Sequence, residues 1–181
     1  MTALPTVTRR VWLKILHWSM VPLFVWFTLV QPADVARIGA TAIWFHSVLG
    51  LMFVTLALIW TADYLWRGLA SRPGPKLPLW GKRFHQIIHK TLIWGMFLVA
   101  FTGFLLGVTA SRQLFAGDLV PIGVPLSLPR ANDWVGLIHS IEFYGLAAVA
   151  VAHAGFHVWR HFALRDNALR IMLPTVLHRF L

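Results

Sequence analysis

Four long apolar runs set the strongest limit on how this chain can fold. They cover about residues 11–30, 41–66, 87–109 and 134–159. About 20 mostly apolar residues are enough for a helix to cross the hydrocarbon core of a membrane. Only helices and closed barrels span membranes, and the runs lack the strict alternation of barrel strands. The sequence therefore predicts an all-α integral membrane four-helix bundle, surrounded by membrane lipid, with residues 1–181 forming a single domain.

The basic residues gather on one predicted side of the membrane. The chain has 16 Lys and Arg against 6 Asp and Glu. Only Arg37, Arg112 and Arg130 lie on the side that faces away from the termini. The positive-inside rule then predicts that both termini are cytoplasmic. Because topology explains the net charge of +10, no nucleic acid partner is expected.

Histidines occur inside the apolar runs, where ionisable residues are costly and mark functional sites by default. By depth, His17 lies near the cytoplasmic side and His46 near the outer side. In the last run, the 14 residues from His139 to His153 rise about 21 Å and stop about 40° short of four turns, so both rings point to one face. Depth therefore pairs His46 with His139, and His17 with His153.

Two histidines at the same depth on facing helices suit the axial positions of a haem iron. A structural zinc site would need four ligands. The chain has no cysteine, which excludes disulfides, thiolate-bound iron–sulfur clusters and covalent haem attachment. Spacing alone does not decide which histidines form the pair on the cytoplasmic side. His157 lies five whole turns from His139 and competes with His153, and His85 or His89 could also partner His17.

Several segments resemble the bacterial di-haem cytochrome b561 family, which is related to the membrane cytochrome b subunits of hydrogenases and formate dehydrogenases. These segments are ILHW at 15–18, FHSVLG at 45–50, His89, Gly103, IHSIEFYGLAAVAVAHAGFHVWRHF and RDNALRIMLP. The resemblance covers nearly the whole chain and implies four helices and two haem b groups. By position it implies that His46 and His139 hold the periplasmic haem and that His17 and His153 hold the cytoplasmic one, which favours His153 over His157.

The resemblance also implies a function. Family members exchange electrons with ubiquinone, and at least one type resembles a superoxide oxidase. We therefore expect an oxidoreductase that carries electrons from a periplasmic donor, either superoxide or a redox protein, through the haems to ubiquinone. Candidate residues near the quinone are His89, Lys90, His157 and Arg160, which share cytoplasmic depth but could equally face lipid headgroups.

Two further expectations concern partners and proton chemistry. Glu142 lies about one turn from His139, so its carboxylate could accept the Nδ1–H of that ring or relay protons. An alternative function is a haem-bearing anchor subunit that passes electrons between a partner dehydrogenase or reductase and the quinone pool. A metal transporter is disfavoured, because the histidines lack accompanying acidic or thioether ligands.

Overall fold

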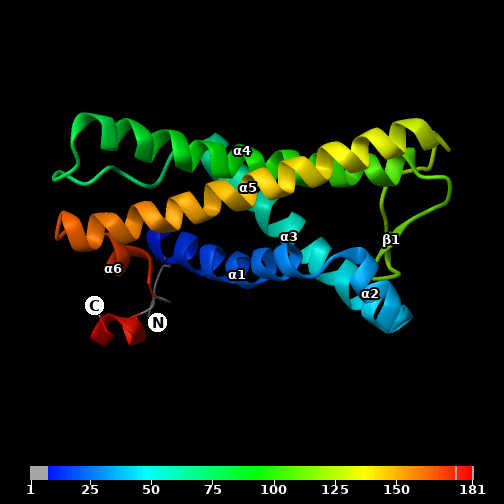
Figure 1. Cartoon of the computed structure of the whole chain (residues 1–181), viewed down its shortest axis with the longest axis horizontal. Helices are drawn as coiled ribbons and strands as arrows, with labels where there is room; N and C mark the ends of the chain where they lie inside the picture. Colours follow the sequence, from blue (N-terminus) through cyan, green and yellow to red (C-terminus); the bar gives the residue numbers. More distant parts are fainter. Residues whose placement is uncertain (1–7, 174, 181) are drawn as a thin grey trace, which may run out of the picture.

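The computed structural model describes residues 8–173 and 175–180, which form a bundle of four long helices (Figure 1). These helices are α1 (Arg9–Leu29), α3 (Ala40–Arg67), α4 (Leu79–Thr109) and α5 (Pro129–Ala163). Each is long and apolar enough to cross a membrane. The predicted all-α membrane bundle is therefore confirmed.

Shorter elements connect or follow the long helices. They are α2 (Pro32–Ile38), the antiparallel strands β1 (Phe115–Ala116) and β2 (Val120–Pro121), α6 (Ala168–Met172) and a 3-10 helix (Thr175–Phe180). The apolar runs did not predict α2, which begins at a proline in its first turn. The carboxylate of Asp34 accepts the backbone N–H of Gln31 at 2.9 Å and so caps this short helix.

The long helices extend beyond the apolar runs. α4 begins at Leu79 rather than near residue 87, and α5 begins at Pro129 rather than near residue 134. Proline suits the first position of a helix, where its missing N–H leaves no hydrogen bond unmade. The 35 residues of α5 correspond to about 52 Å, whereas the hydrocarbon core is about 30 Å thick. The added turns are polar enough to escape a search for apolar runs.

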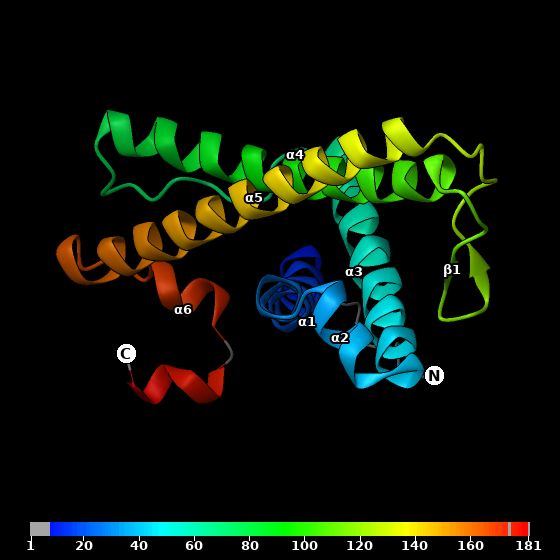
Figure 2. The same cartoon turned by 45° about the vertical axis from the view of Figure 1, so that its right-hand side comes forward.

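The helices pack so that α4 and α5 lie side by side, in both views of the molecule (Figures 1 and 2). α3 packs on both α4 and α1, and α1 also touches α5. The α1–α3 contact is a buried cluster of Leu13, Leu16, Met20, Leu23, Phe53 and Ala57. Its α1 members recur every three or four residues, which places them on one face of that helix.

The two ends of the bundle differ. α1 begins and α5 ends at one end, together with α6, and we call this the basic end (Figure 1). The opposite end carries α2 and the β1–β2 hairpin, and we call it the hairpin end. There the indole N–H of Trp44 donates to the Gly117 carbonyl at 3.1 Å, and the Gly117 N–H donates to the Ser47 hydroxyl at 2.9 Å. The hairpin is thus fixed to the start of α3.

The loop after the hairpin packs directly on Gly107, near the end of α4. A Cβ at this position would collide with the backbone oxygen of Ile122 and lie 2.5 Å from its Cγ2. We predict that Gly107→Val displaces the loop and destabilises the protein by about 2 kcal/mol, as overpacking typically does.

Thermal unfolding in detergent, followed by helical circular dichroism, measures this loss. The matched control is Gly136→Ala, because a Cβ at that position would lie 3.7 Å from Leu106, an ordinary contact. Equal melting temperatures for Gly107→Val and the parent chain would show that the loop does not rest on α4.

Candidate functional site

His139 lies at the hairpin end, where α5 faces α4. Its Nδ1 is 2.9 Å from the hydroxyl oxygen of Thr102, and that hydroxyl is also 2.9 Å from a carboxylate oxygen of Glu142. Gly103 allows the ring to approach α4, because a Cβ there would lie 3.4 Å from the His139 Cε1. The ring is held through Nδ1, which leaves Nε2 for a ligand. The predicted Glu142 contact therefore runs through a threonine.

His46, on α3, lies at the same end of the bundle in a mostly aromatic setting. The indole N–H of Trp26 is directed at its Nδ1 at 3.2 Å. The ring of Phe27 meets it edge-on, with 4.8 Å between centroids. Because an indole only donates, Nδ1 accepts here and Nε2 carries the proton of a neutral ring. Coordination of iron through Nε2 would therefore require the proton to move to Nδ1, and the ring would then lose the hydrogen bond from Trp26.

At the basic end, His17 and His153 each bury an Nδ1 atom for which the described residues offer no hydrogen-bond partner. The His17 ring packs near Trp18 and Trp60, at centroid distances of 5.5 and 6.2 Å. A buried polar group without a partner costs on the order of 1–3 kcal/mol. These two rings, which were predicted as the inner ligand pair, therefore each have a buried nitrogen that residues 8–173 and 175–180 leave without a partner.

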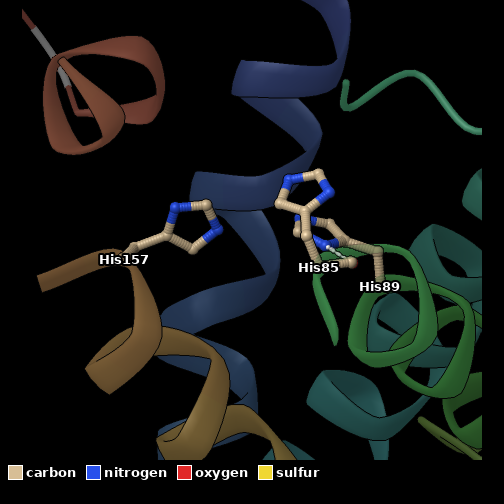
Figure 3. A group of neighbouring side chains, drawn as sticks. All are labelled: His85, His89 and His157. Atoms are coloured by element: carbon tan, nitrogen blue, oxygen red, sulfur yellow. Dashed lines mark hydrogen bonds between the residues drawn. The ribbon is translucent and has the colours of Figure 1, made fainter. Parts of the chain in front are cut away.

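His153 has other histidines beside it. Its ring centroid is 4.6 Å from that of His157 and 4.7 Å from that of His89. His89 and His157 belong to a group that we call the histidine cluster (His85, His89 and His157), whose ring nitrogens lie within 4.8 Å of one another. Figure 3 shows His157 on α5 pointing toward the two rings from α4. The alternatives to His153 thus gather at the same place.

The hydrogen bonds of the cluster indicate which nitrogens are free. The Nδ1 of His89 donates to the backbone carbonyl of His85 at 2.6 Å, so Nε2 of His89 keeps its lone pair. The His85 ring is fully buried and its Nε2 lies 3.0 Å from the Ser71 hydroxyl. The buried Nδ1 atoms of His85 and His157 have no partner among the described residues. The cluster therefore contains imidazole nitrogens that no described residue uses.

Lys90 and Arg160, the other two residues predicted near a quinone, differ in their surroundings. Lys90 lines an open groove of about 520 Å³ with Tyr64, Leu65, Gly68, Leu69, Gln86 and Trp94, on the α3 side of α4. Arg160 is only 3% exposed, so it does not face lipid headgroups. Lys90 thus lies apart from the other three residues predicted near a quinone, whereas the charge of Arg160 lies close enough to act on all three rings of the histidine cluster.

Arg160 and Asp166 form a buried ion pair that we call the clasp. The Nε and Nη2 atoms of Arg160 donate to one carboxylate oxygen at 3.0 and 2.8 Å, and the other oxygen accepts the backbone N–H of Ala168 at 2.9 Å. The α3–α4 loop passes over the clasp at Gly74, where a Cβ would lie 2.7 Å from Arg160 Nη2. The clasp therefore joins the end of α5, the tail and this loop.

We predict that Arg160→Leu destabilises the protein by about 3 kcal/mol, because it leaves the carboxylate of Asp166 buried without a charged partner. The double variant Arg160→Leu/Asp166→Leu should recover most of this loss. Thermal unfolding of the single and double variants measures both. A double variant no more stable than Arg160→Leu would contradict the role given to the clasp.

The donor set fits haem. Imidazoles stand at both ends of the bundle and some lack partners, and neutral imidazole is a common axial ligand of haem iron. Such a membrane bundle is characteristic of membrane b-type cytochromes.

A comparison with family models agrees. The model of prokaryotic cytochrome b561 matches residues 9–175, and the chain belongs to this family. The protein is therefore a bacterial membrane cytochrome whose family transfers electrons across membranes through b-type haem. No curated protein and no solved structure matches the chain.

Sequence reasoning missed several residues that contact these histidines. Thr102, Trp26 and Ser71 each lie within hydrogen-bond reach of a histidine ring. All three are common residue types, and their partners lie 14 to 37 positions away. Helical spacing on one helix cannot reveal such contacts, although depth places Thr102 near His139.

Proposed function

We propose that the protein carries electrons across the bacterial inner membrane, from a periplasmic donor to ubiquinone, and that it uses two haem b groups. The observation that carries this proposal is the burial of His17 and His153 at the basic end, each with an Nδ1 atom for which the described residues offer no hydrogen-bond partner. A second set of imidazoles, His46 and His139, lies at the hairpin end. An electron path across a membrane needs a redox centre near each side.

His46 and His139 would hold one haem and His17 and His153 the other. When bound to these imidazoles, haem would supply a one-electron Fe(III)/Fe(II) couple. The chain contributes the orientation of the rings: Thr102 holds His139 through Nδ1, and the aromatic rings of Trp26 and Phe27 pack against His46. At the basic end, His157 is the competitor, because its ring is 4.6 Å from that of His153.

The orientation of the bundle follows from its charges. Most of the chain's Lys and Arg residues lie at the basic end, so this end would face the cytoplasm with both termini, by the positive-inside rule. The hairpin end would then meet the periplasmic donor. If that donor is superoxide, two anions each lose one electron and leave as O₂. Ubiquinone takes up the two electrons and two protons and becomes ubiquinol.

The basic end offers two places near which ubiquinone could accept protons. The histidine cluster supplies His89 and His157, whose rings lie next to that of His153. The groove beside Lys90 opens between α3 and α4 and includes the polar side chains of Tyr64 and Gln86. Arg160 is bonded to Asp166, so it would contribute to the first place by fixing the end of α5 and by its charge, which lies near the rings of the histidine cluster.

The purified, dithionite-reduced protein should show a b-type α-band and close to two haems per chain by the pyridine haemochrome method. His153→Ala should lose one haem, whereas His157→Ala should keep both. The second variant is the matched control, because it removes an imidazole one turn away on the same helix. A haem lost from His157→Ala and kept in His153→Ala would assign the inner ligand to His157 instead.

Superoxide mixed anaerobically with the oxidised, haem-containing protein should reduce its haem, as followed by stopped-flow absorbance. With a soluble ubiquinone analogue present, one quinol should form for every two superoxide anions consumed. His139→Ala serves as the control for spontaneous dismutation. A haem that dithionite reduces but superoxide does not would contradict the superoxide donor.

That outcome would favour the anchor-subunit alternative, in which a partner dehydrogenase or reductase supplies or takes the electrons. One feature favours it: the hairpin end exposes apolar side chains, with Leu119 at 84% and Val124 at 75% exposure. A partner protein could cover them. Isolation of the intact membrane complex in mild detergent separates the two functions, because the anchor would carry a stoichiometric redox subunit.

A further inference from the structure

Three side chains at the hairpin end form a chain of hydrogen bonds between α4 and α5. Thr102 comes from α4, and its side chain is nearly inaccessible at 7% exposure. Its hydroxyl oxygen lies 2.9 Å from Nδ1 of His139 and 2.9 Å from a carboxylate oxygen of Glu142, both on α5. Glu142 is the only acidic residue within the four apolar runs other than Asp63. A carboxylate inside a membrane span is energetically costly, so such a residue by default indicates a functional role.

Chemistry fixes the direction of the two bonds. An ionised carboxylate can only accept hydrogen bonds, and a threonine hydroxyl has a single hydrogen to donate. The carbonyls of Leu98 and Val99, at 3.0 and 3.2 Å, compete for that hydrogen, as is common for threonine in a helix. A charged acceptor forms the stronger bond. The hydroxyl therefore donates to Glu142, and its lone pair accepts the Nδ1–H of His139, which also has the backbone carbonyl of Val99 within reach.

We propose that Thr102 and Glu142 are positioning residues that hold Nδ1 of His139 protonated, turn Nε2 toward the haem iron and lower the reduction potential of the hairpin-end haem. This inference rests on the proposed haem ligation by His139. An acceptor on Nδ1–H makes the imidazole more basic at Nε2. A more basic ligand stabilises Fe(III) relative to Fe(II), so the couple becomes harder to reduce.

The other candidate ligands lack such an acceptor. Nδ1 of His46 faces the indole N–H of Trp26, which cannot accept. Nδ1 of His17 and of His153 has no hydrogen-bond partner among the described residues. Among the four candidate ligands, the described residues thus link only the hairpin-end imidazole of His139 to a carboxylate. The difference in ligand basicity would drive electrons from the hairpin-end haem to the basic-end haem.

A redox titration of the loaded protein, followed at the haem absorption bands, tests this directly. Thr102→Val keeps the side-chain volume and removes the hydroxyl. We expect the midpoint of one haem to rise and that of the other to stay unchanged. We expect the equilibrium constant for electron transfer between the two haems to change about tenfold, which corresponds to a midpoint shift of about 59 mV for a one-electron couple. Thr102→Ser retains a hydroxyl and should keep the parental midpoint.

Glu142→Gln provides a second, independent variant. It should raise the same midpoint in the parent chain but shift it little further in a Thr102→Val background, because the threonine transmits the effect. Equal shifts in both backgrounds would show a through-space charge effect and overturn the relay. The matched control is Thr61→Val, since Thr61 is a buried threonine that donates to the Ala57 carbonyl of its own helix at 2.9 Å.

Electron paramagnetic resonance of the oxidised protein adds a signature that a packing role would not move. The low-spin signal of one haem should change in Thr102→Val and return in Thr102→Ser. Two bound haems with parental midpoints and signals in both Thr102→Val and Glu142→Gln would overturn the inference. That result differs from failure of the proposed function, in which His139→Ala would retain both haems.

Discussion

Imidazole rings buried inside an apolar bundle need a partner for each polar nitrogen, and the arrangement of this protein follows from that need. His89 is served by a backbone carbonyl, His139 by a threonine hydroxyl and His46 by an indole. Four other rings, those of His17, His85, His153 and His157, bury an Nδ1 atom that the described residues leave without a partner. The chain belongs to a b-type cytochrome family, in which a haem iron takes one nitrogen of each ligating ring, so imidazole nitrogens without a protein partner are expected.

The two ends of the bundle use different chemistry around their rings. At the hairpin end, a hydroxyl and a carboxylate hold one imidazole, and aromatic side chains surround another. At the basic end, imidazoles from α4 and α5 lie together. The carboxylate of Asp166, which lies at the same end, is paired with Arg160. If His139 holds a haem as proposed, the first arrangement would favour oxidised iron. The second leaves nitrogens available for ligands or protons, which suits the end where a quinone would be reduced.

The sequence predicted the long helices well, because membrane spans depend on length and hydropathy, which are local properties. It failed at their margins. α4 starts at Leu79, directly after Pro78, and α2 forms in a segment that the apolar runs did not include. In both places proline and capping groups favour a helix outside the hydrocarbon. It also grouped Lys90 with His89, although neighbouring residues on a helix point about 100° apart. Lys90 consequently faces the groove beside α3, whereas His89 faces α5.

The sequence by itself determined the membrane bundle, its charge asymmetry and the depth of each histidine, because rise per residue converts position into depth without knowledge of neighbours. Only the tertiary structure decided which side chains meet at each depth. The Thr102–Glu142 link to His139, the burial of Arg160 against Asp166 and the meeting of His157 with His85 and His89 depend on the rotation of each helix about its axis. Packing between helices sets that rotation, since in a uniformly apolar helix hydrophobicity does not distinguish the lipid-facing side from the buried one.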